Sequence, residues 1–214
     1  MKIENPSRIV PAMKRALFFI ALVVVSATPL LAQTSEFGAI VGGSRRFVWG
    51  GGDVKSATGE AESDWIESNF SFSNNSIELY WSIPIEPDLN LKFKGGRIES
   101  EIAIPYEGPD PDAPENIITL RRDAEGEVHH LETIIEYKFD EPFGSSGLFA
   151  GLGYYRLTAP NEEARTNWGL NAGVNADFPL SRRYGVVVEA AYHWVRAEFK
   201  PRYLTVGGGL RVSF

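Results

Sequence analysis

The stretch WGLNAGVNADF at residues 168–178 alternates between apolar residues and small or polar ones. Its even-numbered positions hold Trp168, Leu170, Ala172, Val174, Ala176 and Phe178. Its odd-numbered positions hold Gly169, Asn171, Gly173, Asn175 and Asp177. Successive side chains of a β-strand point to opposite sides, so this period of two predicts a strand with one apolar and one polar face.

The same alternation recurs along most of the chain. We predict eight strands, at residues 36–47, 77–83, 89–104, 130–139, 148–157, 168–178, 186–195 and 203–214. Within 89–104 the apolar positions change from odd to even numbers after Gly95-Gly96. A one-residue shift reverses the two faces of a strand. We therefore expect a β-bulge at Gly95-Gly96, after which Arg97, Glu99 and Glu101 continue the polar face.

The composition of the 214 residues excludes several classes of protein. The chain has no Cys, which excludes a disulfide framework and thiolate metal sites. A formal charge of −7 argues against a nucleic-acid partner, which needs a basic surface. No window of 18 consecutive apolar residues occurs, which excludes a polytopic helical membrane protein.

The first 32 residues have the layout of a secretory signal peptide. Lys14 and Arg15 precede the apolar run 16–25, and small residues near Ala32 offer a cleavage site. The run is too short to cross about 30 Å of hydrocarbon. We predict a signal peptide at 1–32, for which Met13 alone would also be a sufficient start, and one mature domain at 33–214.

The connections between the predicted strands alternate in length. The first two odd-numbered ones, 48–76 and 105–127, are long and acidic. The even-numbered ones are short and turn-like, at residues 84–88, 140–147 and 179–185. This asymmetry is typical of outer-membrane barrels, which have short periplasmic turns and longer external loops. Within the second long connection, we expect 120–122 and 128–130 to pair as a hairpin around 123–126.

Alternation alone does not tell which face lies outside, because a soluble lipocalin-like barrel has the opposite arrangement. The polar face carries charges of both signs that would not build a lipocalin core. It predicts a lumen network of Glu78, Lys92, Lys94, Glu132, Glu136, Lys138, Glu189, His193 and Arg211. The fold class we predict is all-β, an eight-stranded antiparallel up-and-down transmembrane β-barrel with a polar lumen and an apolar, lipid-facing exterior.

The C-terminal segment RYLTVGGGLRVSF resembles the signal by which outer-membrane proteins are recognised by the barrel-assembly machinery, with Tyr203, Leu210, Val212 and Phe214 at its marker positions. The segment GLFAGLGYYR at 147–156 and the layout of 33–214 are similar to the OmpA/OmpX/OmpW-like group of small outer-membrane barrels. The resemblance implies a Gram-negative outer-membrane protein, a monomer, with lipids, lipopolysaccharide and the assembly machinery as partners.

The search for chemistry gives no catalytic, cofactor or metal site. His129 and His130 are adjacent and would point to opposite faces of a strand, so they cannot readily bind one ion together. His193 and Glu189 are about 13 Å apart along a strand, too far for a hydrogen bond. We expect a non-enzymatic structural or surface-interaction barrel with a lumen plugged by side chains. The alternatives are a narrow channel for small or hydrophobic solutes and, third, a lipid A-modifying enzyme.

Overall fold

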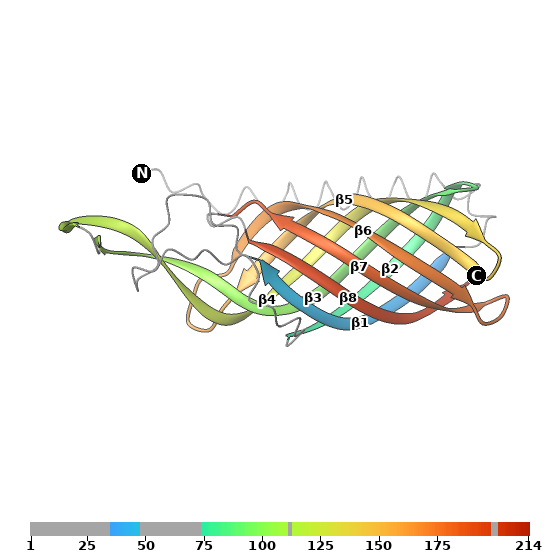
Figure 1. Ribbon diagram of the computed structural model, residues 1–214, viewed down its shortest axis with the longest axis horizontal. Helices are drawn as coiled ribbons and strands as arrows, with labels where there is room; N and C mark the ends of the chain where they lie inside the picture. Colours follow the sequence, from blue (N-terminus) through green and yellow to red (C-terminus); the bar gives the residue numbers. More distant parts are fainter. Residues whose placement is uncertain (1–34, 48–73, 111–112, 198–200) are drawn as a thin grey trace, which may run out of the picture.

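The computed structural model describes residues 35–47, 74–110, 113–197 and 201–214, so the predicted signal peptide lies outside the described residues. The described residues form the strands β1 (Glu36–Phe47), β2 (Asn74–Glu86), β3 (Leu89–Asp110), β4 (Ala113–Glu141), β5 (Gly144–Thr158), β6 (Arg165–Pro179), β7 (Tyr184–Val195) and β8 (Arg202–Ser213). Each strand is antiparallel to the next, and β8 pairs with β1 to close the barrel (Figure 1). The predicted eight-stranded fold is confirmed. Within these ranges we find no helix with the length and apolar character of a membrane span.

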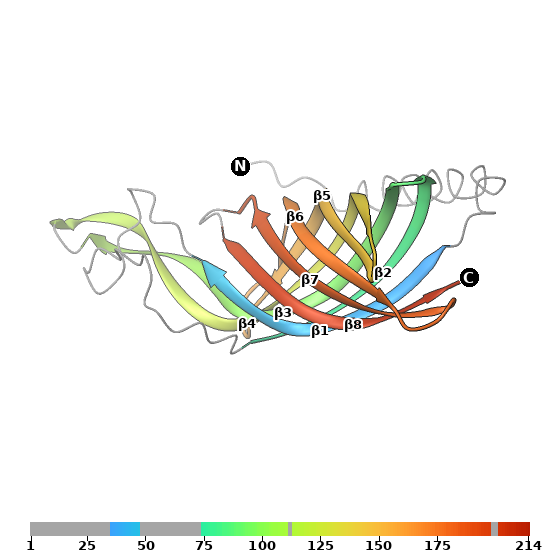
Figure 2. The same cartoon turned by 45° about the vertical axis from the view of Figure 1, so that its right-hand side comes forward.

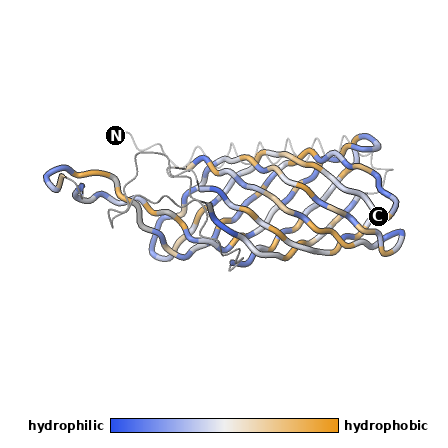
Figure 3. Tube along the Cα trace, viewed as in Figure 1, coloured by the Kyte–Doolittle hydropathy of each residue, from blue (hydrophilic) through white to orange (hydrophobic). Residues whose placement is uncertain are grey.

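The exterior of the barrel is apolar and its interior polar, as the alternation predicts. Along β6, Val174 is 50% exposed, while Asn171, Asn175 and Asp177 are buried. Figure 3 shows hydrophobic and hydrophilic positions alternating along the strands of the barrel. The outward apolar positions of β6 run from Trp168 to Phe178. Ten intervals of about 3.3 Å, tilted by about 40°, span about 25 Å, the height of the apolar band of an outer-membrane barrel.

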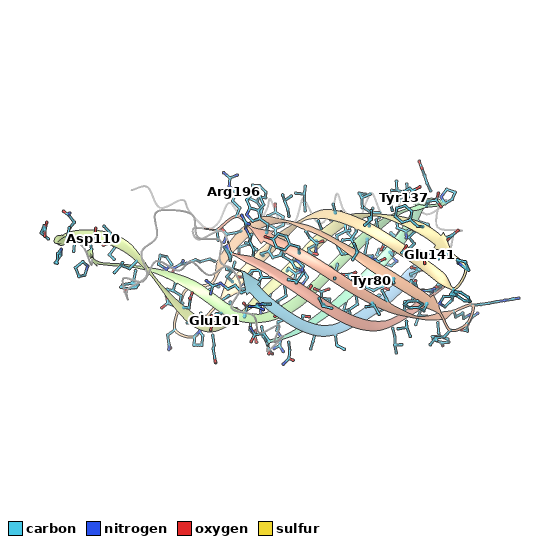
Figure 4. The ribbon with its side chains drawn as sticks, in the orientation of Figure 1. Tyr80, Glu101, Asp110, Tyr137, Glu141 and Arg196 are labelled. Atoms are coloured by element: carbon cyan, nitrogen blue, oxygen red, sulfur yellow. The ribbon has the colours of Figure 1, made fainter. Side chains whose placement is uncertain are left out.

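The two ends of the barrel differ. Tight turns at 87–88 and 142–143 and a slightly longer one at 180–183 lie at the end that carries the C-terminus. At the other end β3 and β4, with 22 and 29 residues, continue past the other strands as a two-stranded hairpin (Figure 2). Figure 4 places Tyr137 and Glu141 at the turn end and Asp110 on the tip of the hairpin.

The hairpin does not have the pairing that we expected from the sequence. Leu120 pairs with Tyr106, and Val128 pairs with Ile98, so 120–122 and 128–130 do not pair with each other. The chain reverses between Asp110 and Ala113, which are themselves paired. Residues 117–128 pair with the outward continuation of β3, whose backbone groups would otherwise lack partners along this edge. Residues 123–126 therefore lie within β4 and form no separate turn.

The expected bulge at Gly95-Gly96 is also wrong. Gly96 pairs with Glu78 on β2 and with His130 on β4, and the register continues without a shift on both sides. Ile98 is therefore buried in the lumen, and Arg97 faces outward. The reason is that the lumen itself becomes apolar at this height. The described irregularity between β2 and β3 lies elsewhere, between Pro84 and Glu86.

Candidate functional site: the charged lumen

The centre of the lumen is organised around the ammonium group of Lys94, which β3 directs inward. Its Nζ lies 2.6 Å from Glu189 Oε1, 3.1 Å from Glu78 Oε2 and 3.8 Å from Glu132 Oε2. These carboxylates come from β7, β2 and β4, and all four side chains are almost completely buried. Because β3 and β7 are not neighbours in the barrel, the bond between Lys94 and Glu189 crosses the lumen.

Lys92 forms a second centre nearer the turn end. Its Nζ lies 2.6 Å from Glu136 Oε1 and 3.7 Å from Glu189 Oε2, so Glu189 joins the two lysines. Asn90 and Asn175 both donate side-chain amide hydrogen bonds to Glu136. The ammonium group of Lys92 also stands 4.8 Å from the centre of the Tyr80 ring, a cation–π distance.

A separate group of charges closes the turn end. Arg211 donates to Asp177 and lies 3.5 Å from Glu36, and Lys138 donates to Glu36 at 2.9 Å. These four side chains are partly accessible, unlike those around Lys94. With two positive and two negative charges, this group is balanced.

On the hairpin side of Lys94 lies a cluster that contains two histidines. His193 Nδ1 is 3.0 Å and His130 Nδ1 is 3.2 Å from the same oxygen, Glu132 Oε1. Tyr155 donates its hydroxyl to that oxygen at 2.5 Å, and Asn171 donates to Glu132 Oε2 at 2.8 Å. The ligand atoms of His130, Glu132 and His193 all lie within 4.8 Å of one another.

A layer of apolar side chains covers the histidine cluster toward the hairpin. Ile98, Val128, Val195 and Tyr203 are completely buried and pack together with Tyr155. A cavity of about 970 Å³ lies at the base of the hairpin. Its lining residues include Ser44, Arg46, Glu99, Glu101, Glu127 and Thr158. The lumen itself thus has an apolar seal on the hairpin side of a charged centre.

The structure places the predicted lumen residues inside the barrel, with Lys138 and Arg211 in the group at the turn end. Three central members were absent from that prediction: His130, Tyr155 and Asn171. The signal for His130 was present in the sequence, since it precedes Glu132 by two residues and so shares its face.

The marker positions of the C-terminal segment divide between the two faces. Tyr203 is buried in the lumen seal, whereas Leu210 and Phe214 point outward. Val212 pairs with Phe37 on β1 and Tyr184 on β7. Recognition of these residues by the assembly machinery stays a prediction.

An apolar band around a charged, filled interior defines a transmembrane β-barrel. No family model and no curated protein sequence matches the chain. Among solved structures, Neisserial surface protein A superposes with a TM-score of 0.56 at 15% identity, over 84% of this chain and 97% of that one.

Two further structures are less similar. The N-terminal barrel domain of Pseudomonas aeruginosa OprF has a TM-score of 0.49 and 14% identity, over 85% of this chain and 97% of that one. The attachment invasion locus protein Ail of Yersinia pestis has a TM-score of 0.46 and 12% identity, over 85% of this chain and 98% of that one. Together with the apolar exterior, the likeness to the Neisserial protein gives the fold: the chain has the fold of a small eight-stranded outer-membrane β-barrel.

Proposed function

We propose that this protein is a structural or surface-interaction barrel whose lumen is closed by its own side chains, and that it is not an enzyme. The observation that carries the proposal is the direct ion pair between Lys94 and Glu189 across the lumen. In a lumen with a continuous water-filled channel, these two side chains would have to lie apart. The buried seal of Ile98, Val128 and Tyr203 blocks the same path at a second height.

The proposal includes the place of the protein in the cell. Residues 1–32 direct export, and the C-terminal strand ending at Phe214 is read by the barrel-assembly machinery. The folded monomer then contacts outer-membrane lipids and lipopolysaccharide, without a nucleic-acid partner. The hairpin formed by the ends of β3 and β4 stands beyond the apolar band, where it offers a surface to partners outside the membrane.

Conductance across a planar bilayer tests the closed lumen. We expect no steady conductance from the wild-type protein. Arg211→Ala and Glu189→Ala each remove one member of the lumen ion pairs and should increase leak. Arg97→Ala is the matched control, because Arg97 pairs with Glu99 and Glu127 on the outer face. A large, stable wild-type conductance that neither lumen substitution changes would instead favour the narrow channel.

A further inference from the structure

We propose that the histidine cluster is a binding site for one divalent metal ion of the zinc type, with His130, Glu132 and His193 as ligands. Four-coordinate Zn²⁺ with ligands at 2.0–2.1 Å has ligand–ligand separations of about 3.3 Å. Glu132 Oε1 lies 3.0 Å from His193 Nδ1 and 3.2 Å from His130 Nδ1. The Tyr155 hydroxyl, 3.2 Å from His193 Nδ1, is within reach as a fourth ligand.

The contacts of His193 place its two ring nitrogens in different surroundings. Nε2 lies 3.2 Å from the Thr205 hydroxyl, which fixes the ring from that side. Nδ1 faces Glu132 Oε1 at 3.0 Å, and the side-chain nitrogen of Asn171 is 3.3 Å away. A metal ion would bind at Nδ1 in place of the proton that this nitrogen shares with Glu132 in the hydrogen bond.

His130 is oriented by a second carboxylate. Its Nε2 lies 3.6 Å from Glu78 Oε1, on the opposite side of the ring from Glu132. A metal-bound histidine commonly directs its other ring nitrogen at a carboxylate, which fixes the ring and strengthens the ligand. Neither ring nitrogen of His130 is aligned for a hydrogen bond with a described residue, although the side chain is completely buried. An ion at Nδ1 would satisfy one of these two atoms.

The net negative charge of the buried centre also favours binding of a divalent cation. Its members are the carboxylates of Glu78, Glu132, Glu136 and Glu189 and the ammonium groups of Lys92 and Lys94. Four negative charges against two positive ones leave an excess of two negative charges in a region closed to water. Buried charges without compensation are strongly unfavourable. One Zn²⁺ ion neutralises the excess.

One ion would also join the two histidine rings, which stand 5.3 Å apart between centroids. Because the apolar layer and Lys94 enclose the site, we expect the ion to enter during folding and to exchange slowly afterwards.

Metal content after refolding tests the site. The protein is refolded into lipid vesicles with Zn²⁺ or Co²⁺ and washed with chelator. The wild type should retain about one ion, and the Co²⁺ form should show the visible absorption of a four-coordinate site. His130→Asn and His193→Asn should retain less than about one-tenth of an ion. His129→Asn is the control, because this neighbour points outward and should retain the wild-type amount.

Folding of each variant is checked by its altered gel migration without boiling. Should the lumen variants fail to fold, the wild type still decides: Zn²⁺ should raise its urea midpoint of unfolding, and EDTA present during refolding should abolish the increase. Retention below about one-tenth of an ion by the wild type overturns the site. A midpoint that Zn²⁺ leaves unchanged but that rises between pH 8 and pH 5 overturns it in favour of two protonated histidines.

Discussion

Replacing Lys94 by methionine should be one of the most damaging single changes in the lumen. Lys94 is completely buried and pairs with Glu78, Glu132 and Glu189. Methionine keeps the length of the side chain and removes its charge, so the negative excess of the centre grows from two to three. Breaking a buried pair by removing one partner costs about 3–5 kcal/mol. We expect Lys94→Met to lower the free energy of unfolding by that amount.

The same ion pair should respond differently when its carboxylate is removed. In Glu189→Gln, Lys94 keeps Glu78 and Glu132 within 3.1 and 3.8 Å. The negative excess falls from two to one, which offsets part of the lost attraction. We therefore expect a cost of about 1.5–3 kcal/mol, that of a hydrogen bond to a charged group. An isolated ion pair would instead lose a similar amount from either side.

A pair on the outer surface provides the control for burial. Arg97 lies 2.9 Å from Glu127, and each of the two side chains is 39% exposed. Exposed pairs contribute about 0–1 kcal/mol, so Arg97→Met should stay within that range. Lys94→Met and Arg97→Met therefore remove ion pairs of similar length, one buried in the lumen and one exposed on the surface.

Urea unfolding in lipid vesicles, followed by Trp fluorescence, gives the three free energies. Chelator is present throughout, so that only the charges of the protein enter the balance. Two results would refute the reasoning: a cost of Lys94→Met no larger than that of Arg97→Met, or a cost of Glu189→Gln larger than that of Lys94→Met. The first would show that the centre is effectively solvated. The second would show that the negative excess does not exist.

Three further predictions concern the membrane and assembly. Deleting Phe214 should reduce outer-membrane levels at native expression, measured by immunoblotting of membrane fractions; equal levels would contradict its role in assembly. Val174→Arg should cost about 2–4 kcal/mol near the bilayer midplane, while Ile117→Arg on the hairpin should cost no more than about 1 kcal/mol, both by urea titration in vesicles. The protein should fractionate with outer membranes and change its gel migration on boiling; recovery in the soluble periplasm without that change would argue against the location.

The alternation of residues was sufficient to predict the barrel because each strand carries the pattern locally. Trp168 to Phe178 show both faces of β6 without any knowledge of neighbouring strands. The pattern failed at Gly96, where we assumed that the lumen is polar throughout. A Cβ atom at Gly96 would lie 2.8 Å from His130 Nε2, so the glycine makes room for a lumen side chain. Ile98 then begins the apolar seal, which the rule of a polar interior cannot anticipate.

The extended hairpin was hidden for a different reason. Pro105 and Pro109 interrupt the alternation in β3, and acidic residues make the same stretch look like a loop. Proline cannot donate a hydrogen bond and is found in edge strands. In the structure, Pro105 pairs with Arg121 and Pro109 with Ile117, in the part of the hairpin that has lost its barrel neighbours. A two-stranded ribbon tolerates prolines that a closed sheet would exclude.

The histidine cluster shows where prediction from local pattern ends. Alternation places His130 and Glu132 on one face of β4, but it does not bring His193 to them from β7. Tyr155 on β5 pairs with Asn167 on β6, and His193 on β7 pairs with Asn171 on β6, four residues further along. The Tyr155 hydroxyl nevertheless contacts His193. Tilted strands produce this offset, because residues at one height in a barrel are not hydrogen-bonded partners. Locating such a site from sequence therefore requires the stagger of the barrel in addition to the faces of its strands.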